Sequence, residues 1–195
     1  FREIFVKRLI AYVHALRCHL RNEDPTEAIK QFLPPEDLTK VLASGHRPLA
    51  ILHQLGHDLA SARDRHWLHE LNFPSMDAQL NELSNILGGC ERIKNTPIPF
   101  SYSVLIHRIV ASYCLFLPFG LVETTGVLTP IVVLLISYAF FELDAIGDEI
   151  ENPFGLQPND LPLTAISRNV EINLLELINY PDRPAALKPE NDILM

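Results

Sequence analysis

The sequence predicts an all-α membrane protein in which a transmembrane helical hairpin is joined to a cytosolic helical bundle. Three observations lead to this fold class. Two apolar runs, 109–122 and 127–141, are separated by a short turn without Lys or Arg. No stretch alternates between apolar and polar residues as a strand would. The 15 prolines of the chain divide it into short helical segments.

The two apolar runs are each short for a membrane span, because about 20 residues are needed to cross about 30 Å of hydrocarbon. Extending the first run back to Phe100 and the second forward to Ile146 gives enough helix for both. We therefore expect a transmembrane hairpin at residues 96–150, which enters and leaves the bilayer on the same side. The alternative is a buried helical hairpin of a large soluble protein.

The charges beside the hairpin indicate its orientation. Arg92 and Lys94 precede the first span, whereas the turn at 124–126 holds no cation. Because cytoplasmic loops carry an excess of Lys and Arg, we expect the turn outside the cell and both flanks in the cytoplasm. This topology predicts a multi-pass protein of the inner (plasma) membrane with a cytoplasmic domain.

Length and composition suit a small membrane part and one soluble part. The chain has 195 residues and a formal net charge of −8. Its three cysteines form no CxxC pair, so neither a disulfide framework nor a zinc knuckle is indicated. No nucleic-acid-binding module is recognisable. The chain begins at Phe1, already within a helical pattern, and we expect it to be a C-terminal portion of a longer protein.

Residues 1–95 are expected to form a cytosolic helical region that begins with an amphipathic helix at 1–21. Helical spacing predicts one buried face, made of Phe5, Leu9, Tyr12, Val13, Leu16 and Leu20. The basic residues of this helix are expected on a solvated side, or against anionic lipid headgroups: Arg2, Lys7, Arg8, Arg17 and Arg21.

Proline and glycine mark the helices that follow. Short helices are expected at 25–33 and 36–43, and a longer one after Pro48 that residues 63–71 either continue or follow with another. The next helix begins at Pro74, where a first-turn proline sacrifices no hydrogen bond. We expect Gly88-Gly89 to end it.

Histidines concentrate between positions 46 and 69. His53 and His57 stand four apart, so on a helix they share a face and could hold one metal ion. His66 and His69 could add a second pair. Membrane di-iron enzymes also need His-His doublets or Glu-x-x-His partners, which this chain lacks. Solvated surface histidines are the simpler interpretation.

Five carboxylates follow the second span within ten residues: Glu142, Asp144, Asp148, Glu149 and Glu151. They could draw cations toward a cytoplasmic opening of a pore, or they could form a solvated helix face. Their spacing is not that of a calcium-binding loop.

Residues 151–179 are expected to hold a further cytosolic helix, and residues 180–195 a flexible, proline-rich tail. Asn159-Asp160 is predicted to cap this helix. Its buried stripe is predicted to consist of Leu163, Ile166, Val170, Leu174 and Leu177.

Arg108 is the unfavourable residue of the first span, since placing a charged side chain in lipid raises the free energy. It lies about 12 Å along a helix that starts at Phe100, at a rise of about 1.5 Å per residue. Arg108 is therefore either an interfacial anchor, together with Tyr102, or buried in a bundle of helices.

Five blocks of sequence point to a family. They lie at 88–93, 96–108, 135–138, 148–155 and 159–163, and the most specific one runs from acidic residues into Asn-Pro-Phe-Gly after the last membrane helix. In order and spacing these blocks resemble the bestrophin family of pentameric ion channels, specifically its bacterial branch. The motif residues are Pro97, Pro99, Tyr102, His107, Arg108, Asn152, Pro153, Phe154, Gly155 and Asp160.

The resemblance implies an all-helical homopentamer around a central pore, with four membrane helices per subunit and both termini in the cytoplasm. The hairpin matches the last two of these helices. The first two, with the apolar neck of the pore, have no counterpart in this sequence. The implied function is passive ion flow, without a catalytic residue or cofactor. The implied partners are other copies of the chain, the bilayer and permeating monovalent ions.

The resemblance also implies a second constriction at the cytosolic mouth of the pore, supplied by residues 68–71. Leu71 is the candidate ring residue, with Leu68 beside it. Five leucines around an axis would form a narrow apolar gate that works by dewetting. The other interpretation of Leu71 is a core residue of its helix.

Calcium control and ion selectivity follow less directly from the resemblance. Animal members carry a dense acidic stretch after Asn-Pro-Phe-Gly, whereas this chain has a single carboxylate there, Asp160, so we expect no tight calcium clasp. The family is usually described as chloride channels, and some bacterial relatives prefer cations. The net negative charge of this chain and the carboxylates after the second span favour cation selectivity. A non-conducting membrane scaffold and a membrane metalloenzyme using the histidine pairs are the alternative functions.

Overall fold

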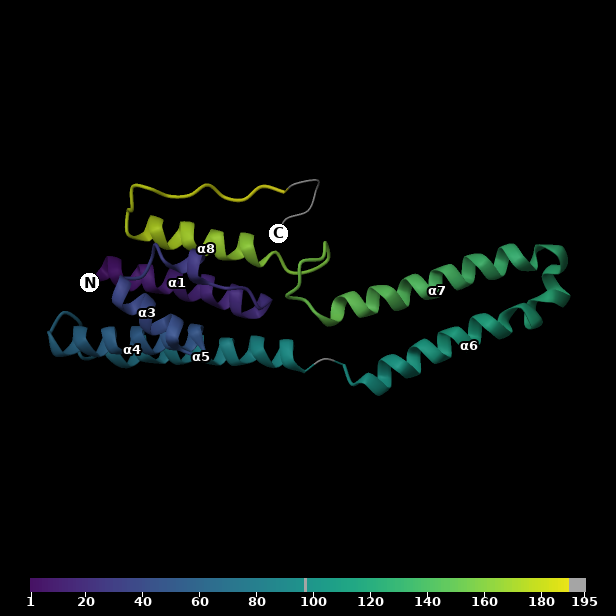
Figure 1. The fold of residues 1–195 in the computed structure, drawn as a ribbon, viewed down its shortest axis with the longest axis horizontal. Helices are drawn as coiled ribbons and strands as arrows, with labels where there is room; N and C mark the ends of the chain where they lie inside the picture. The colour runs from purple at the N-terminus through teal and green to yellow at the C-terminus, as the bar shows by residue number, and fades with distance from the viewer. Residues whose placement is uncertain (97, 190–195) are drawn as a thin grey trace. The chain divides into compact units, whose positions relative to one another are not determined.

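The computed structural model describes residues 1–96 and 98–189, apart from the side chain of Asp148. Every regular element among these residues is a helix, α1 to α8, with one 3₁₀ turn, η1, between α6 and α7. The all-α fold class is therefore confirmed (Figure 1). The chain divides into two compact units. The first contains Phe1–Asn95 and the chain from Leu161 onward, and the second is Thr96–Asp160.

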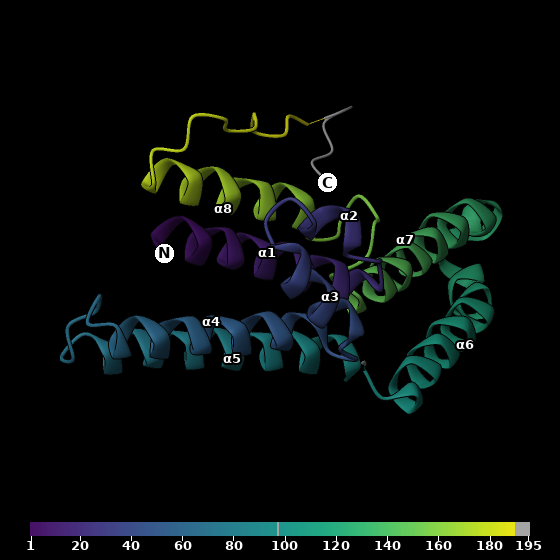
Figure 2. The ribbon, with the colours of Figure 1, turned by 60° about the vertical axis from the view of Figure 1, so that its left-hand side comes forward.

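α1 (Arg2–Arg21) is the central helix of the first unit. α4 (Arg47–Asp64) and α8 (Leu163–Leu177) pack on opposite sides of it, as Figures 1 and 2 show. Because α1 is covered from several sides, its burial is not confined to the predicted face. Phe5 and Leu9 are only partly buried. The buried side chains also include Val6, Arg8, Ile10, Ala11, His14, Ala15 and Cys18.

Two short helices, α2 (Thr26–Ile29) and α3 (Pro35–Ala43), connect α1 to α4. Ile29 joins Ile10, Ile51 and Leu55 in the fully buried core. α4 ends at Asp64, so residues 65–72 neither continue it nor form another helix, and this prediction is wrong. The physical reason is local, because His66 adopts a left-handed backbone with φ 57° that turns the chain.

α5 (Phe73–Asn95) continues through Gly88-Gly89, so the predicted helix end is also wrong. Glycine in a helix costs about 1 kcal/mol relative to alanine, and tertiary packing can outweigh that cost. Leu80, Leu83 and Leu87 pack against the core of the first unit. The Tyr12 hydroxyl also donates to the Leu83 carbonyl at 2.9 Å.

The second unit is a hairpin of two long helices, α6 (Phe100–Thr125) and α7 (Thr129–Glu151), joined by η1 (Gly126–Leu128). Gly126 starts the turn with φ 52°, a conformation that glycine adopts without a steric penalty. The Thr125 and Thr129 hydroxyls lie 2.8 Å apart across the turn. At about 1.5 Å per residue the two helices are about 39 and about 34 Å long. Both lengths suffice for about 30 Å of hydrocarbon.

Among the described residues, only the stretch Phe100–Glu151 is long and apolar enough to cross a membrane, judged by length and composition. Its most apolar window has a mean hydropathy of 2.0, and 6% of that window is buried. The core helix of a soluble protein would be mostly buried. The exposed side chains Phe116, Phe119 and Leu134 are instead suited to lipid.

α8 begins at Leu163 with Pro162 before it and no side-chain cap, so the cap predicted at Asn159-Asp160 is wrong. The buried face is also shifted from the predicted stripe. Ile166 and Leu177 are exposed. The buried residues are Ala165, Ser167, Glu171 and Leu175.

The chain beyond α8 has no helix among residues 181–189. Tyr180, just before it, accepts a hydrogen bond from the Lys7 ammonium group at 3.4 Å and so contacts α1. Arg183 forms an ion pair with Glu176 at 3.5 Å. The last part of the predicted flexible tail, residues 190–195, lies outside the described residues.

Candidate functional site

The segment between α4 and α5 carries the candidate constriction residues. The Leu71 side chain is 80% exposed, which excludes its interpretation as a core residue of this chain. Its backbone N–H donates to His69 Nδ1 at 3.2 Å. Leu68 is half-buried beside it. The segment therefore exposes the Leu71 side chain, which no apolar group among the described residues of the same chain buries.

The motif residues that precede α6 position the start of that helix. Pro99 is the N-cap residue, and its carbonyl accepts a hydrogen bond from the Tyr102 N–H at 2.7 Å. Tyr102 and Arg108 are exposed. The hairpin itself therefore does not bury Arg108, and either lipid headgroups or another chain would surround it. Pro97 lies outside the described residues.

His107 and Asp144 face each other between α6 and α7, with His107 Nε2 3.4 Å from Asp144 Oδ2. They line a mostly apolar cavity of about 270 Å³ within the hairpin, together with residues such as Val110 and Phe140. Glu151, also at the cavity, is half-exposed. This end of the hairpin therefore combines an apolar interior with charged groups.

The other carboxylates of α7 differ in their surroundings. Glu142 is exposed, whereas Glu149 accepts a hydrogen bond from the Asn159 amide at 2.6 Å. The side chain of Asp148 lies outside what the structure describes. Two of the predicted vestibule charges, Asp144 and Glu149, thus have polar partners within the hairpin unit.

The Asn-Pro-Phe-Gly motif forms a tight turn after α7. Phe154 is only 5% exposed. Asp160 Oδ2 accepts the Gln157 N–H at 2.7 Å and lies against Gly155, where an added Cβ would collide with it. Asn152 and Pro153 open the turn, and the Gly155 N–H donates to the Asn152 carbonyl at 3.4 Å. Asp160 therefore closes this turn instead of capping α8.

The predicted histidine pairs do not assemble into one site. The rings of His53 and His57 lie edge to face on α4, with centroids 4.5 Å apart. His66 and His69 lie in the turn segment beyond the end of α4. Among the described residues, neither pair belongs to a group of three metal-ligating side chains.

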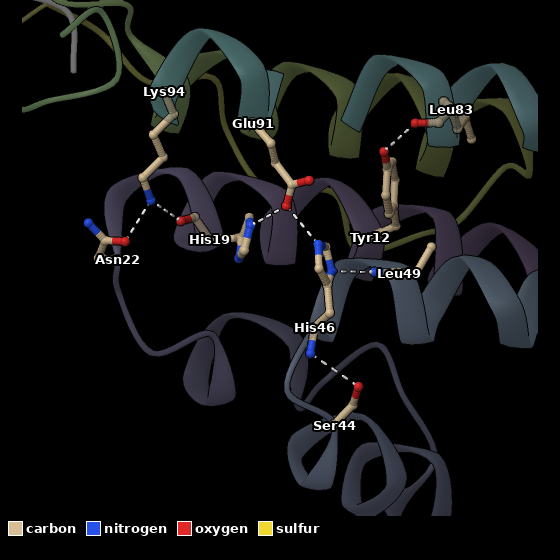
Figure 3. A network of polar contacts seen from close by, with 9 residues as sticks. All are labelled: Tyr12, His19, Asn22, Ser44, His46, Leu49, Leu83, Glu91 and Lys94. Carbon is tan, nitrogen blue, oxygen red and sulfur yellow. Dashed lines mark hydrogen bonds and ion pairs between the residues drawn. The ribbon is translucent and has the colours of Figure 1, made fainter. Parts of the chain in front are cut away.

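A different polar network joins α1, α4 and α5 (Figure 3). His19 Nε2 and His46 Nε2 lie 2.7 and 2.6 Å from the same oxygen, Oε1 of Glu91. Lys94 donates to the His19 carbonyl at 2.8 Å and to Asn22 Oδ1 at 2.6 Å. Sequence reasoning missed this network, because His19, His46 and Glu91 are far apart in the chain and no local spacing connects them.

Glu91 remains a carboxylate in this network. Burial alone would raise its pKa, but the hydrogen bonds from His19 and His46 outweigh this effect and lower it below the ordinary value. Its neighbour Cys90 is half-buried, and burial raises the pKa of that thiol. The two adjacent side chains therefore differ, one a ready anion and the other an unreactive thiol.

Comparisons with known proteins agree with one another. A family model described as bacterial and fungal bestrophin protein matches residues 1–176. A voltage-dependent anion channel-forming protein, YneE, of Salmonella typhimurium is 43% identical over 188 residues, which cover 96% of this chain and 62% of that protein. The Escherichia coli K12 protein of the same name is 42% identical over 186 residues, covering 95% and 61%.

Solved structures give the same similarity. The crystal structure of a bacterial bestrophin homologue from Klebsiella pneumoniae, solved by zinc SAD phasing, matches with a TM-score of 0.86 at 38% identity. The match covers 91% of this chain and 66% of that one. The chain thus spans less than two thirds of the length of these relatives.

Proposed function

The chain belongs to the bacterial and fungal bestrophin family of membrane proteins, and we propose that in its complete form it is a subunit of a homopentameric anion channel. The channel would lie in the inner membrane, with the first unit in the cytoplasm. The hairpin carries the proposal, since its most apolar window is only 6% buried and needs lipid or neighbouring subunits around it.

The exposed leucine supports a role for the first unit in the pore. The Leu71 side chain is 80% exposed, and a ring of five copies around an axis would bring these side chains together. Such a ring would let ions pass only when it is wetted. We propose that Leu71 forms this cytosolic constriction and that Leu68 supports it from the side.

Anion conduction is favoured over the cation preference that the acidic composition suggests. The bacterial relatives are named as anion channel-forming proteins. The carboxylates of Asp144 and Glu149 are directed toward His107 and Asn159 of the same chain. Passive conduction needs no catalytic residue, and we assign none.

Single-channel recording tests the proposal. The complete purified protein would be placed in a planar bilayer under a KCl gradient, and we expect discrete currents that reverse near the equilibrium potential of chloride. Reversal near the potassium potential would refute anion selectivity. Silence from protein shown to be pentameric would favour the non-conducting scaffold.

The Leu71→Ala variant tests the constriction. Shortening the side chain widens an apolar ring and makes wetting easier, so we expect a conductance that rises about twofold or more, or a weakened selectivity. Leu177→Ala is the matched control, because Leu177 is an exposed leucine of the same unit. Unaltered currents in a folded Leu71→Ala channel would remove Leu71 from the conduction path.

A further inference from the structure

We propose that His19, His46 and Glu91 form a binding site for a divalent transition-metal ion, with Zn²⁺ as the best-suited ion. Their ligand atoms all lie within 4.8 Å of one another, and no other group of three such side chains is found among residues 1–96 and 98–189. The proposal does not depend on the channel function, and it concerns residues remote in sequence from the constriction.

The chemistry of the three groups matches zinc. Imidazole nitrogen and carboxylate oxygen bind Zn²⁺ at about 2.0–2.2 Å, and two histidines with one glutamate leave a fourth position for water. In a tetrahedral site such ligand atoms stand about 3.3 Å apart. Glu91 Oε1 now lies 2.6–2.7 Å from the two nitrogens, at hydrogen-bonding distance. A withdrawal of the carboxylate by less than about 1 Å would admit the ion, and Glu91 is only partly buried.

Three separate elements hold the ligands in place without an ion. His19 is in the last turn of α1, His46 is the N-cap residue of α4, and Glu91 is one turn before the end of α5. Figure 3 shows the two rings and the carboxylate pointing toward one another. The core of the first unit packs these helices together. The conformational entropy lost in bringing the three ligands together is therefore lost on folding and not on ion binding.

Proton positions define the main cost of binding. His46 Nδ1 accepts the Leu49 N–H at 3.3 Å, so the ring carries its proton on Nε2 and donates it to Glu91. Binding of zinc at Nε2 moves that proton to Nδ1 and breaks the bond from Leu49. That bond caps the N-terminus of α4, so its loss, which leaves the His46 and Leu49 N–H groups facing each other, is the main cost of binding. Lys94 is a nearby cation. Its ammonium group donates to the His19 carbonyl and to Asn22 Oδ1 instead of to Glu91.

One of the three ligand residues lines a polar hollow. His19 borders a polar hollow of about 290 Å³ that also touches Asn22, Glu23, Ser44 and Arg47. Once bound, the ion would fasten the last turn of α5 to α1 and to the start of α4. Five residues beyond the end of α5, α6 begins. The site would therefore stabilise the end of the helix that leads into the hairpin.

Zinc titration of the full chain tests the proposal. Protein purified in detergent and freed of metal with a chelator would be titrated with ZnCl₂ and analysed for bound metal. We expect one ion per chain, and an affinity at least tenfold weaker in His19→Ala and in His46→Ala. His53→Ala is the matched control, since it removes an exposed histidine of the same unit, and it should bind zinc like the wild type.

The outcomes separate the alternatives. Absence of zinc uptake by the wild type at 100 µM, or equal affinity in the variant that lacks all three ligands, would overturn the site. Because a variant could lose its fold, circular dichroism would check helicity. A zinc-soaked crystal of the wild type gives an independent result. An anomalous peak between the three side chains supports the site, and a peak at His53 and His57 alone refutes it.

Discussion

His14 is a buried histidine whose partner comes from the other end of the chain. Its Nε2 lies 2.9 Å from Glu171 Oε2, and its ring stacks on Phe32 with centroids 5.6 Å apart. Burial lowers the pKa of His14 from its ordinary value of 6.5; the Glu171 carboxylate opposes this shift, whereas Arg17 and Arg168 add to it. His14 is therefore neutral in the folded protein at neutral pH.

This lowered pKa predicts a pH-dependent stability. Between pH 6.5 and the lowered folded value, the unfolded chain binds a proton at His14 that the folded chain does not bind, so stability falls as the pH is lowered through this window. His14→Gln should show a shallower fall in melting temperature between about pH 7 and about pH 5.5. His53→Gln, at an exposed position, should keep the wild-type slope. Parallel slopes for wild type and His14→Gln would contradict the assignment.

The burial of charged residues was predicted least well from the sequence. Arg8 was expected on a solvated basic side, but it is buried and forms ion pairs with Asp37 and Asp58. A buried charge is tolerated only when it is paired. Arg8 and Asp37 are 29 positions apart, and His14 and Glu171 are 157 apart. Periodicity reports on neighbours along one helix and contains no information on such distant partners.

The two central glycines of α5 are a feature of one element. A Cβ added at Gly88 or Gly89 would meet no atom within 4 Å, and both backbones are helical. Glycine has more conformational freedom in the unfolded chain than alanine, and this freedom is lost on folding. Gly88 and Gly89 therefore destabilise α5, although no neighbouring atom among the described residues of this chain requires a residue without a Cβ at either position.

Replacing one of these glycines should stabilise the protein. Gly88→Ala is expected to add about 0.5–1 kcal/mol to the free energy of unfolding, which corresponds to roughly 1–4 °C in melting temperature. Gly126→Ala is the control with the opposite sign, since its φ of 52° is strained for alanine. A lower melting temperature for Gly88→Ala would show that another molecule covers this face of α5.

At the scale of elements, the sequence predicted helices better than their ends. The hairpin could be predicted because two long apolar runs are separated by one short turn within a stretch of 52 residues. The end of α5 could not, since the packing of Leu83 and Leu87 overrides the tendency of glycine to end a helix. The face of α8 was also mispredicted, because the buried Glu171 carboxylate contacts His14 of α1 and apolar spacing does not indicate such a contact.

At the scale of the whole molecule, the family motifs located Leu71 and Asn-Pro-Phe-Gly, which composition alone would not have singled out. The cluster of His19, His46 and Glu91 could not be predicted, since it exists only when three helices pack together. Contacts between side chains of different helices can be identified only once the fold is known. Side chains that act within one turn, such as Asp160 on Gln157, are nearer to what a sequence can indicate.

The orientation of the hairpin gives the last prediction. Val127 in the η1 turn is 95% exposed, and Leu177 in the first unit is 63% exposed. If the turn lies outside the cell and the first unit in the cytoplasm, a cysteine at Val127 should react with a membrane-impermeable maleimide in intact cells. A cysteine at Leu177 should react only after permeabilisation. Both would be made in a background in which Cys18, Cys90 and Cys114 are alanine.

The labelling pattern distinguishes three topologies. Reaction of Val127→Cys alone in intact cells places the turn outside, as the positive charge of Arg92 and Lys94 before α6 requires. Reaction of Leu177→Cys alone would show the inverted orientation. Equal labelling of both positions from one side would mean that the hairpin does not cross the bilayer. In that case the exposed apolar surface of α6 and α7 would have to be covered by protein, and the channel proposal would lose its main support.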